Sequence, residues 1–379
     1  MTRYQTFTPR TEIVFGDGLL ERLHAYRGQR VGIVTDEFMA KSGPLDRVMS
    51  FLDGCEVKVF AEAIPEPPLA TVSAGARLFA DFRPDVVLAL GGGSPIDAAK
   101  AILSVVRGMD PAHPIRLVAI PTTSGTGSEV TAFAVISDPA NNRKFPLISP
   151  DLIPDVAILD PEFVRTAPPK VTADTGMDVI THAIEAVVAK GASNFTDAFA
   201  EKSLELAFAA LPKAFDNGND IAARDAMHQA SCLAGMAFTE AGLGINHGLA
   251  HAIGGQFHLV HGRINAILLP HVIAWNAGLE DNAPETRETA ARYARIAQRV
   301  GLDVPGTRAG VLALIRAIEA LNARFGIPAS LRGLGLDIGA YRRAIPDLAA
   351  AAFADACTAG NPRRPGLAEL SMLLDRAGG

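Results

Sequence analysis

The first part of the chain alternates short apolar runs with segments of helical periodicity. The runs predict buried β-strands at residues 12–15, 30–35, 56–60, 85–90 and 116–120. Residues 44–52 place Leu45, Val48, Met49 and Leu52 on one side of a helix. Because strands that alternate with helices usually form parallel sheets, this part of the chain predicts an α/β domain.

The pattern changes after Pro161, where alternation ends and alanine and leucine recur at helical spacing. This periodic pattern predicts helices over residues 173–188, 196–211, 221–238, 246–256, 285–300, 308–325, 341–356 and 367–377. The stretch Ala167-Pro168-Pro169-Lys170 is typical of a hinge. We therefore expect an α/β domain over residues 1–167 and an all-helical domain over residues 168–379.

Composition narrows the class of protein. The 379 residues are 49% hydrophobic and 20% charged, which indicates a globular chain with a large core. A net charge of −6 argues against nucleic acid as a partner. Three widely spaced cysteines predict reduced thiols and a cytoplasmic location. We expect no membrane contact, because the apolar runs are shorter than the ~18 residues that a membrane span needs.

A glycine-rich segment follows the strand at residues 85–90. Gly91, Gly92, Gly93 and Ser94 precede a predicted helix that contains Asp97. Glycines at a strand-to-helix turn let backbone N–H groups approach a phosphate, and the helix N-terminus adds partial positive charge. The alternative is a simple tight turn, since the segment does not match GxGxxG.

A second loop rich in hydroxyl groups follows the strand at residues 116–120 and contains Thr122, Thr123 and Thr126. Two such loops after strands of one sheet favour nucleotide binding more than either loop alone. Asp36, which ends the strand at residues 30–35, is positioned to accept a bond from a ribose 2′-hydroxyl and to repel a 2′-phosphate. Its alternative role is that of a helix N-cap.

Residues 242–271 contain five of the nine histidines in the chain. His247 and His251 share a helical face, and Asp178 and His182 repeat the same spacing upstream. Histidines and a carboxylate suit a divalent metal such as Fe²⁺ or Zn²⁺. A lone histidine on an apolar helix is more often a core residue, so spacing by itself leaves both interpretations open.

These segments resemble the iron-containing (group III) alcohol dehydrogenases. The resemblance assigns the metal ligands to Asp178, His182, His247 and His261, and it rests on TADTGMDVITHAIEA and GLGINHGLAHAIGGQFHL. The family's GGGSxxDxxK and PTTxGTGSE segments, which line its NAD(H) site, are also present. The resemblance implies a dehydroquinate synthase-like fold with the site in the cleft between an α/β domain and a helical domain. It also implies a cofactor contact by Lys144.

Within the family the chain is most similar to the 1-propanol dehydrogenases of propanediol-using bacteria. This implies reduction of short aldehydes such as propanal, with His251 relaying a proton. It further implies a homodimer or larger assembly, and association with a bacterial microcompartment. We expect apolar residues near the ligands, Ile245, Leu249 and Ile253 among them, to line the substrate cleft.

Three residues depart from the family pattern: Glu66, Val260 and Arg263. Arg263 would be a partner for a charged substrate, so reductases of lactaldehyde or sulfoacetaldehyde remain alternatives. Two further alternatives are a phosphate-binding lyase like dehydroquinate synthase and an inactive, metal-bound scaffold. The lyase would need several basic residues near the site, where the sequence has only Arg263.

Overall fold

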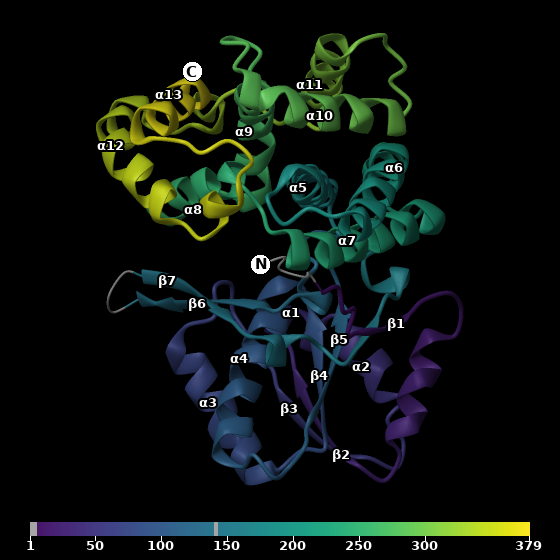
Figure 1. Ribbon diagram of the computed structural model, residues 1–379. Coiled ribbons are helices and arrows are strands. Elements are labelled where there is room, and N and C mark those ends of the chain that lie inside the picture. Colours follow the sequence, from purple (N-terminus) through teal and green to yellow (C-terminus); the bar gives the residue numbers. More distant parts are fainter. Residues whose placement is uncertain (1–5, 140–142) are drawn as a thin grey trace. The chain divides into compact units, whose positions relative to one another are not determined.

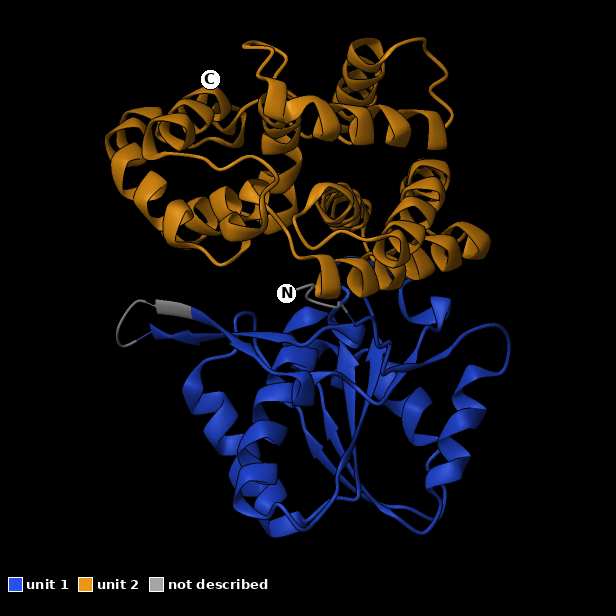
Figure 2. Ribbon diagram, in the orientation of Figure 1, with its two compact units in different colours: residues 1–166 blue, residues 167–379 orange. Residues whose placement is uncertain are grey.

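The computed structural model describes residues 6–139 and 143–379, without the side chains of residues 143 and 144. The chain forms two compact units, residues 1–166 and residues 167–379 (Figure 2).

Unit 1 is built around a parallel sheet with the strand order β1-β8-β5-β4-β2-β3 (Figure 1). The predicted strands are all present, and β8 adds a sixth. The strands are β1 (Glu12–Val14), β2 (Arg30–Val34), β3 (Glu56–Phe60), β4 (Val86–Gly91), β5 (Arg116–Pro121) and β8 (Val156–Ile158). The order reverses between β2 and β4, because β3 and β4 lie on opposite sides of β2. Open sheets of this kind bind ligands at the carboxyl ends of the strands beside such a reversal.

Both faces of the sheet are covered, so the central strand β4 is apolar and buried at every position. In β4, Val87 and Ala89 pack with residues of α3 (Leu69–Phe82) and α4 (Gly93–Met109). Val86, Leu88 and Leu90 belong to the core on the other face, with residues of η1 (Leu19–Tyr26) and α2 (Pro44–Met49). The short helix α1 (Glu37–Lys41) follows β2.

A two-stranded antiparallel hairpin, β6 (Phe133–Asp138) and β7 (Arg143–Ile148), completes unit 1. The sequence analysis did not predict it. Its first strand packs against α4, with Ile136 in the same core as Ile102.

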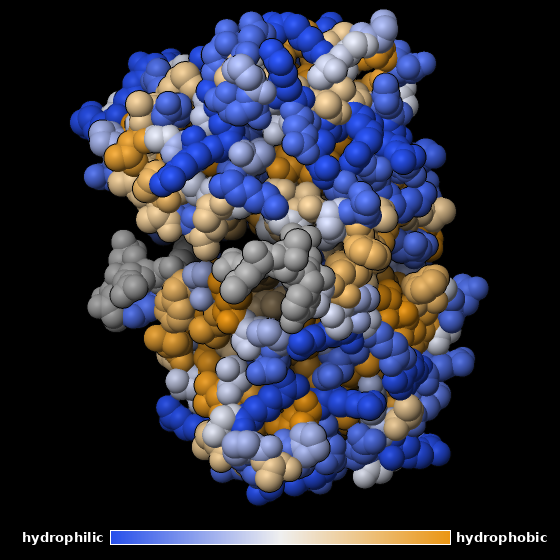
Figure 3. Space-filling view, viewed as in Figure 1, coloured by the Kyte–Doolittle hydropathy of each residue, from blue (hydrophilic) through white to orange (hydrophobic). Residues whose placement is uncertain are grey.

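Unit 2 is helical in the residues that the structure describes. Its α-helices are α5 (Pro169–Val188), α6 (Asn194–Asp216), α7 (Ile221–Ala241), α8 (Ile245–Phe257), α9 (His261–Asn276), α10 (Arg287–Arg299), α11 (Thr307–Arg324), α12 (Ile338–Ala354) and α13 (Leu367–Gly378). The predicted fold class, an α/β part followed by an all-helical part, is confirmed. Polar residues cover much of the visible face of this unit (Figure 3). Among the described residues, no helix is both long and apolar enough to cross a membrane.

Helix α9, which begins at His261, was not predicted from the sequence. Pro270 lies inside this helix, and glycine is its second residue, so its propensity is low. Tertiary packing compensates, because Ile264, Leu268 and Leu269 are fully buried.

Candidate metal centre and cofactor loops

The predicted metal ligands come from three helices of unit 2. Asp178 and His182 lie one turn apart on α5, His247 lies in the first turn of α8, and His261 begins α9. One ligand atom each from Asp178, His247 and His261 lies within 4.8 Å of the other two. His182 lies beside this group, with its ring stacked on that of His247 at 4.5 Å between centroids.

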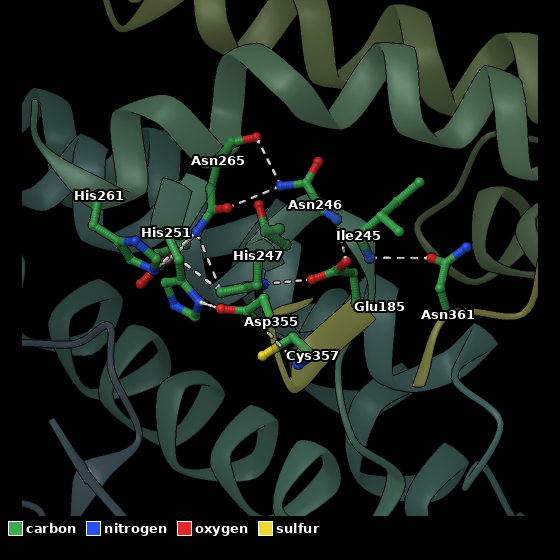
Figure 4. A network of polar contacts seen from close by, with 12 residues as sticks. Glu185, Ile245, Asn246, His247, His251, His261, Asn265, Asp355, Cys357 and Asn361 are labelled. Carbon is green, nitrogen blue, oxygen red and sulfur yellow. Dashed lines mark hydrogen bonds and ion pairs between the residues drawn. The ribbon is translucent and has the colours of Figure 1, made fainter. Parts of the chain in front are cut away.

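The three acceptor atoms converge on one point, which is now contacted by Asn265 of α9 (Figure 4). Its side-chain nitrogen lies 2.7 Å from Asp178 Oδ1, 3.1 Å from His261 Nε2 and 3.2 Å from His247 Nε2. The buried His182 has no hydrogen-bond partner at Nδ1. A carboxylate and imidazole nitrogens that face one point are a donor set that fits Fe²⁺ or Zn²⁺.

Gly262 explains why α9 approaches α5 closely enough for this arrangement. A Cβ atom built on Gly262 would lie 2.1 Å from the backbone oxygen of Asp174 and 3.2 Å from Cβ of Asp178. No other residue fits there without displacing a helix. The glycine thus keeps His261 close to Asp178.

Glu185 orients His247 and was not singled out in the sequence analysis. His247 donates from Nδ1 to one Glu185 carboxylate oxygen, and the other accepts a bond from the Asn246 N–H at 2.8 Å. A carboxylate behind a histidine fixes the ring so that Nε2 faces the metal position. Glu185 could have been found, because Asp178, His182 and Glu185 stand at i, i+4 and i+7 on one face of α5.

The charges around the cluster favour the metal-binding forms of Asp178 and His182, whereas His247 must lose a proton to bind a metal. Burial lowers the pKa of His182 to about 3, so this ring is neutral at pH 7. Burial opposes the charge of Asp178, but the neighbouring histidines hold the pKa of that carboxyl well below its ordinary value. Against the effect of burial, the Glu185 and Asp178 carboxylates raise the pKa of His247 to about 9. A neutral imidazole and an ionised carboxylate are metal-binding forms, so His182 and Asp178 are ready to bind a metal, whereas His247 holds a proton at pH 7 that a bound metal would displace.

His251 is far more exposed than the buried His247, and its ring stacks on that of His261 at 5.3 Å between centroids. Its Nδ1 lies 3.0 Å from Oδ2 of Asp355, the residue that caps the C-terminus of α12. This leaves Nε2 of His251 as the nitrogen available to a substrate. Asp355 lies 104 residues away in the chain, so no local pattern pointed to it.

Arg263 and three apolar residues near the centre differ from what was expected of them. Arg263 is bound to Asp174 of α5 at 2.7 Å, with only 13% of its side chain exposed, so its charge is already paired. The expected lining residues Ile245, Leu249 and Ile253 are fully buried within unit 2. Their proposed place on a substrate cleft was therefore wrong, because a side chain with no exposed surface cannot contact a substrate.

In unit 1, the two predicted cofactor loops lie side by side at the carboxyl ends of β4 and β5. The N–H of Thr122 donates to the Gly91 carbonyl at 3.0 Å. A Cβ atom on Gly92 would lie 3.2 Å from Thr123, and one on Gly93 would lie 2.9 Å from Thr126. Ser94 follows in the first turn of α4, which begins at Gly93. The glycines thus permit close packing of the loops where a helix N-terminus can receive a phosphate.

Asp36, at the end of β2, caps α1 by accepting a bond from the Met39 N–H at 2.8 Å. The N-cap alternative is therefore observed, and it engages one of the two carboxylate oxygens. Asp97 uses both of its oxygens within the protein: Ser128 Oγ donates to one at 2.7 Å, and the Val135 N–H donates to the other at 2.9 Å. The side chain of Lys144 lies outside the described residues.

Glu66 adopts a left-handed backbone conformation, with φ of 53°. Asparagine tolerates this conformation better than glutamate, so the backbone at this position favours asparagine.

The whole chain resembles known dehydrogenases. Residues 9–161 match the family model "Iron-containing alcohol dehydrogenase", and residues 172–378 match "Fe-containing alcohol dehydrogenase family, C-terminal". A 1-propanol dehydrogenase of Salmonella typhimurium is 44% identical over 98% of this chain and 99% of its own. An NADPH-dependent butanol dehydrogenase of Clostridium saccharobutylicum is 39% identical over 97% of both chains.

Among solved structures, the sulfoacetaldehyde reductase of Bifidobacterium kashiwanohense in complex with NAD⁺ superposes with a TM-score of 0.85. It is 28% identical, and the match covers 100% of this chain and 99% of that one. Three findings agree: two family models together cover most of the sequence, relatives are more than 40% identical, and the fold matches. The chain belongs to the iron-containing alcohol dehydrogenase family and is an oxidoreductase.

Proposed function

We propose that this protein is an Fe²⁺-dependent, NAD(H)-linked alcohol dehydrogenase that reduces short primary aldehydes, with propanal to 1-propanol as its main reaction. The observation that carries the proposal is the convergence of Asp178, His247 and His261 on one point, with His182 beside them. A 1-propanol dehydrogenase 44% identical over almost the whole chain supports the substrate.

Asp178, His182, His247 and His261 would hold the metal, and Zn²⁺ suits the same donors. When bound, the metal acts as a Lewis acid that polarises the aldehyde carbonyl. Bound NADH would supply a hydride for the carbonyl carbon, and the carbonyl oxygen would then need a proton. His251, whose Nδ1 is engaged by Asp355, would give this proton from Nε2.

The proposal is tested by NADH oxidation with propanal, using protein purified without oxygen and loaded with Fe²⁺. Activity should disappear when a chelator removes the metal and return when Fe²⁺ is added back. Full turnover in metal-free protein would refute metal dependence. No NADH oxidation by loaded protein with any short aldehyde would favour the inactive scaffold.

Cofactor choice is the first prediction. Asp36 follows β2 beside the reversal of strand order, and one of its oxygens remains after capping α1. We expect wild type to prefer NADH, and Asp36→Gly to raise kcat/KM with NADPH by about tenfold, because the charge conflict with the 2′-phosphate is removed. Unchanged discrimination would remove Asp36 from the cofactor site. Asp46→Gly, which changes an acidic residue on α2, is the control.

Substrate charge is the second prediction. The Arg263 guanidinium is bound to Asp174, so it is not free to pair with a sulfonate or a carboxylate. In a panel of propanal, butanal, lactaldehyde, glyceraldehyde and sulfoacetaldehyde, propanal should have the highest kcat/KM. Butanal should follow propanal, because one methylene in a substrate pocket is worth about 1–3 kcal/mol, or roughly 10- to 200-fold in kcat/KM. A preference for sulfoacetaldehyde of about tenfold, or about 1.4 kcal/mol, would contradict this assignment.

Assembly is the third prediction. β1 pairs only with β8 within the described sheet, and this leaves its other edge available to a second copy. We propose a homodimer or larger assembly, which light scattering should detect as a mass of at least about twice 39.8 kDa. A monomer at working concentrations would refute it. Association with a bacterial microcompartment rests on the family resemblance, and fractionation of purified compartments tests it.

A further inference from the structure

The helix that follows the glycine loop carries a lysine whose whole side chain is buried. Lys100 of α4 has no exposed surface. Its Nζ lies 2.7 Å from the Phe133 carbonyl, 2.8 Å from the Thr131 carbonyl, 3.1 Å from Thr131 Oγ1 and 3.0 Å from Ser128 Oγ. These acceptors lie on the segment between the threonine loop and β6. Lys100 thus ties α4 to that segment.

Asp97, one turn earlier on α4, binds the same segment. Its two oxygens accept from Ser128 Oγ at 2.7 Å and from the Val135 N–H at 2.9 Å. Ser128 Oγ donates to Asp97 and accepts from Lys100, so the three side chains form one connected network. Residues 128–135 are therefore attached to α4 by both charged groups.

The same helix also carries the first cofactor loop, because α4 begins at Gly93. The segment that Asp97 and Lys100 hold comes directly after Thr126 of the second loop. The two loops meet where Gly92 faces Thr123 and Gly93 faces Thr126. The spacing between the two loops is thus fixed in two ways. The glycines pack closely against Thr123 and Thr126, and the network of Asp97, Lys100 and Ser128 joins α4 to the segment after the second loop.

Lys100 is a fully buried charge and Asp97 a partly buried one, and burying charge is costly, so their presence calls for a reason. Burial lowers the pKa of Lys100 to about 8 and raises the pKa of Asp97. Burial also raises the pKa of the neighbouring Glu129 to about 7. A purely structural link between a helix and a hairpin could be made with apolar side chains at lower cost, as β6 and α4 already do through Ile136 and Ile102.

We infer that Asp97 and Lys100 are positioning residues, which hold the two loops at the spacing that NAD(H) requires before the cofactor binds. The inference rests on the proposed function, since it assumes that the loops bind NAD(H). Ordering a loop in advance strengthens binding, because the cofactor then loses less free energy to immobilising it. Neither residue needs to contact the cofactor.

The test measures the dissociation constant of NADH by calorimetry on the metal-loaded full chain. Lys100→Met removes the ammonium and keeps an unbranched side chain, and Asp97→Asn removes one charge at nearly constant volume. We expect the Kd to rise by about tenfold or more for Lys100→Met and by less for Asp97→Asn. At saturating NADH, kcat should stay within about threefold of wild type, and metal content should be unchanged, because the metal ligands lie in unit 2.

Asp85→Asn is the matched control. Asp85 also binds a backbone amide, that of Arg30 at 2.8 Å, but it precedes β4 and so lies at the opposite end of the strand from the loops. This variant should lose thermal stability without a change in Kd. Rescue is tested with Lys100→Arg, which keeps the charge and should bind NADH more tightly than Lys100→Met.

The outcomes distinguish the positioning role of Asp97 and Lys100 from the proposed NAD(H)-linked function. A folded Lys100→Met variant with the wild-type Kd would overturn the inference, as would an equal loss in Asp85→Asn. If Lys100→Met does not fold, Asp97→Asn decides, and a wild-type Kd in that variant overturns the inference. If wild type itself does not bind NADH, the proposed function fails instead.

Discussion

Replacing His261 with alanine should abolish metal binding and reduce kcat/KM for propanal by about a thousandfold or more. His261 supplies one of the three ligand atoms that lie within 4.8 Å of one another, and it is the only proposed ligand on α9, so the variant keeps only the ligands of α5 and α8. Lewis acid polarisation of a carbonyl is worth several kcal/mol, and each 1.4 kcal/mol is about a factor of ten in rate. Metal analysis and steady-state kinetics on the same preparation would measure both effects.

His258→Asn is the control for this variant. His258 lies three residues earlier, ends α8 and has a left-handed backbone with φ of 53°, which asparagine tolerates. The His258→Asn variant should retain both metal and activity. Equal losses in the two variants would indicate general disruption of this region, and full turnover of His261→Ala would refute its assignment as a ligand.

Glu185→Gln should weaken metal binding by about 10- to 100-fold while leaving the fold intact. Glutamine can still accept the Asn246 N–H through its oxygen, but its amide group would face His247 Nδ1 as a donor. The imidazole would then lose the partner that aims Nε2 at Asp178 and His261. Titration against a competing chelator would give the dissociation constant of the metal.

Glu201→Gln serves as the comparison, because Glu201 is also a buried carboxylate of unit 2 but pairs with Arg295 and Arg299. It should lower the melting temperature and leave metal affinity unchanged. If Glu185→Gln binds metal as tightly as wild type, the orienting role of Glu185 is wrong.

The sequence predicted best where a local pattern has a single structural solution. Apolar runs bounded by turn residues gave the strands, and the i, i+4 pair of Asp178 and His182 does lie on one helical face. The fold class and the family were predicted correctly. Helix α9 was missed because its stability comes from contacts with the rest of unit 2, which no propensity records.

The partners of the site residues were harder to predict, because they depend on tertiary contacts. Asp355 meets His251 from 104 residues away. Asp97 was expected at the cofactor, yet both of its oxygens bind Ser128 and Val135. Ile245 has the apolar character of a pocket residue, but packing places it in the core. Residue type showed which chemistry was available, and only the packing showed where each group was used.

The contact between Gly262 and the backbone of Asp174 also restricts how this chain can evolve. Any larger residue at position 262 would begin 2.1 Å from a carbonyl oxygen, so the helices would have to separate before it could be accommodated. Substitutions of Gly262 should therefore be selected against for as long as the metal centre is needed. Once metal chemistry is no longer needed, such substitutions can accumulate. Among homologues that keep a histidine at the position of His261, we expect those without a glycine at the position of Gly262 to have lost catalytic activity. Measuring the metal content of such homologues would test this.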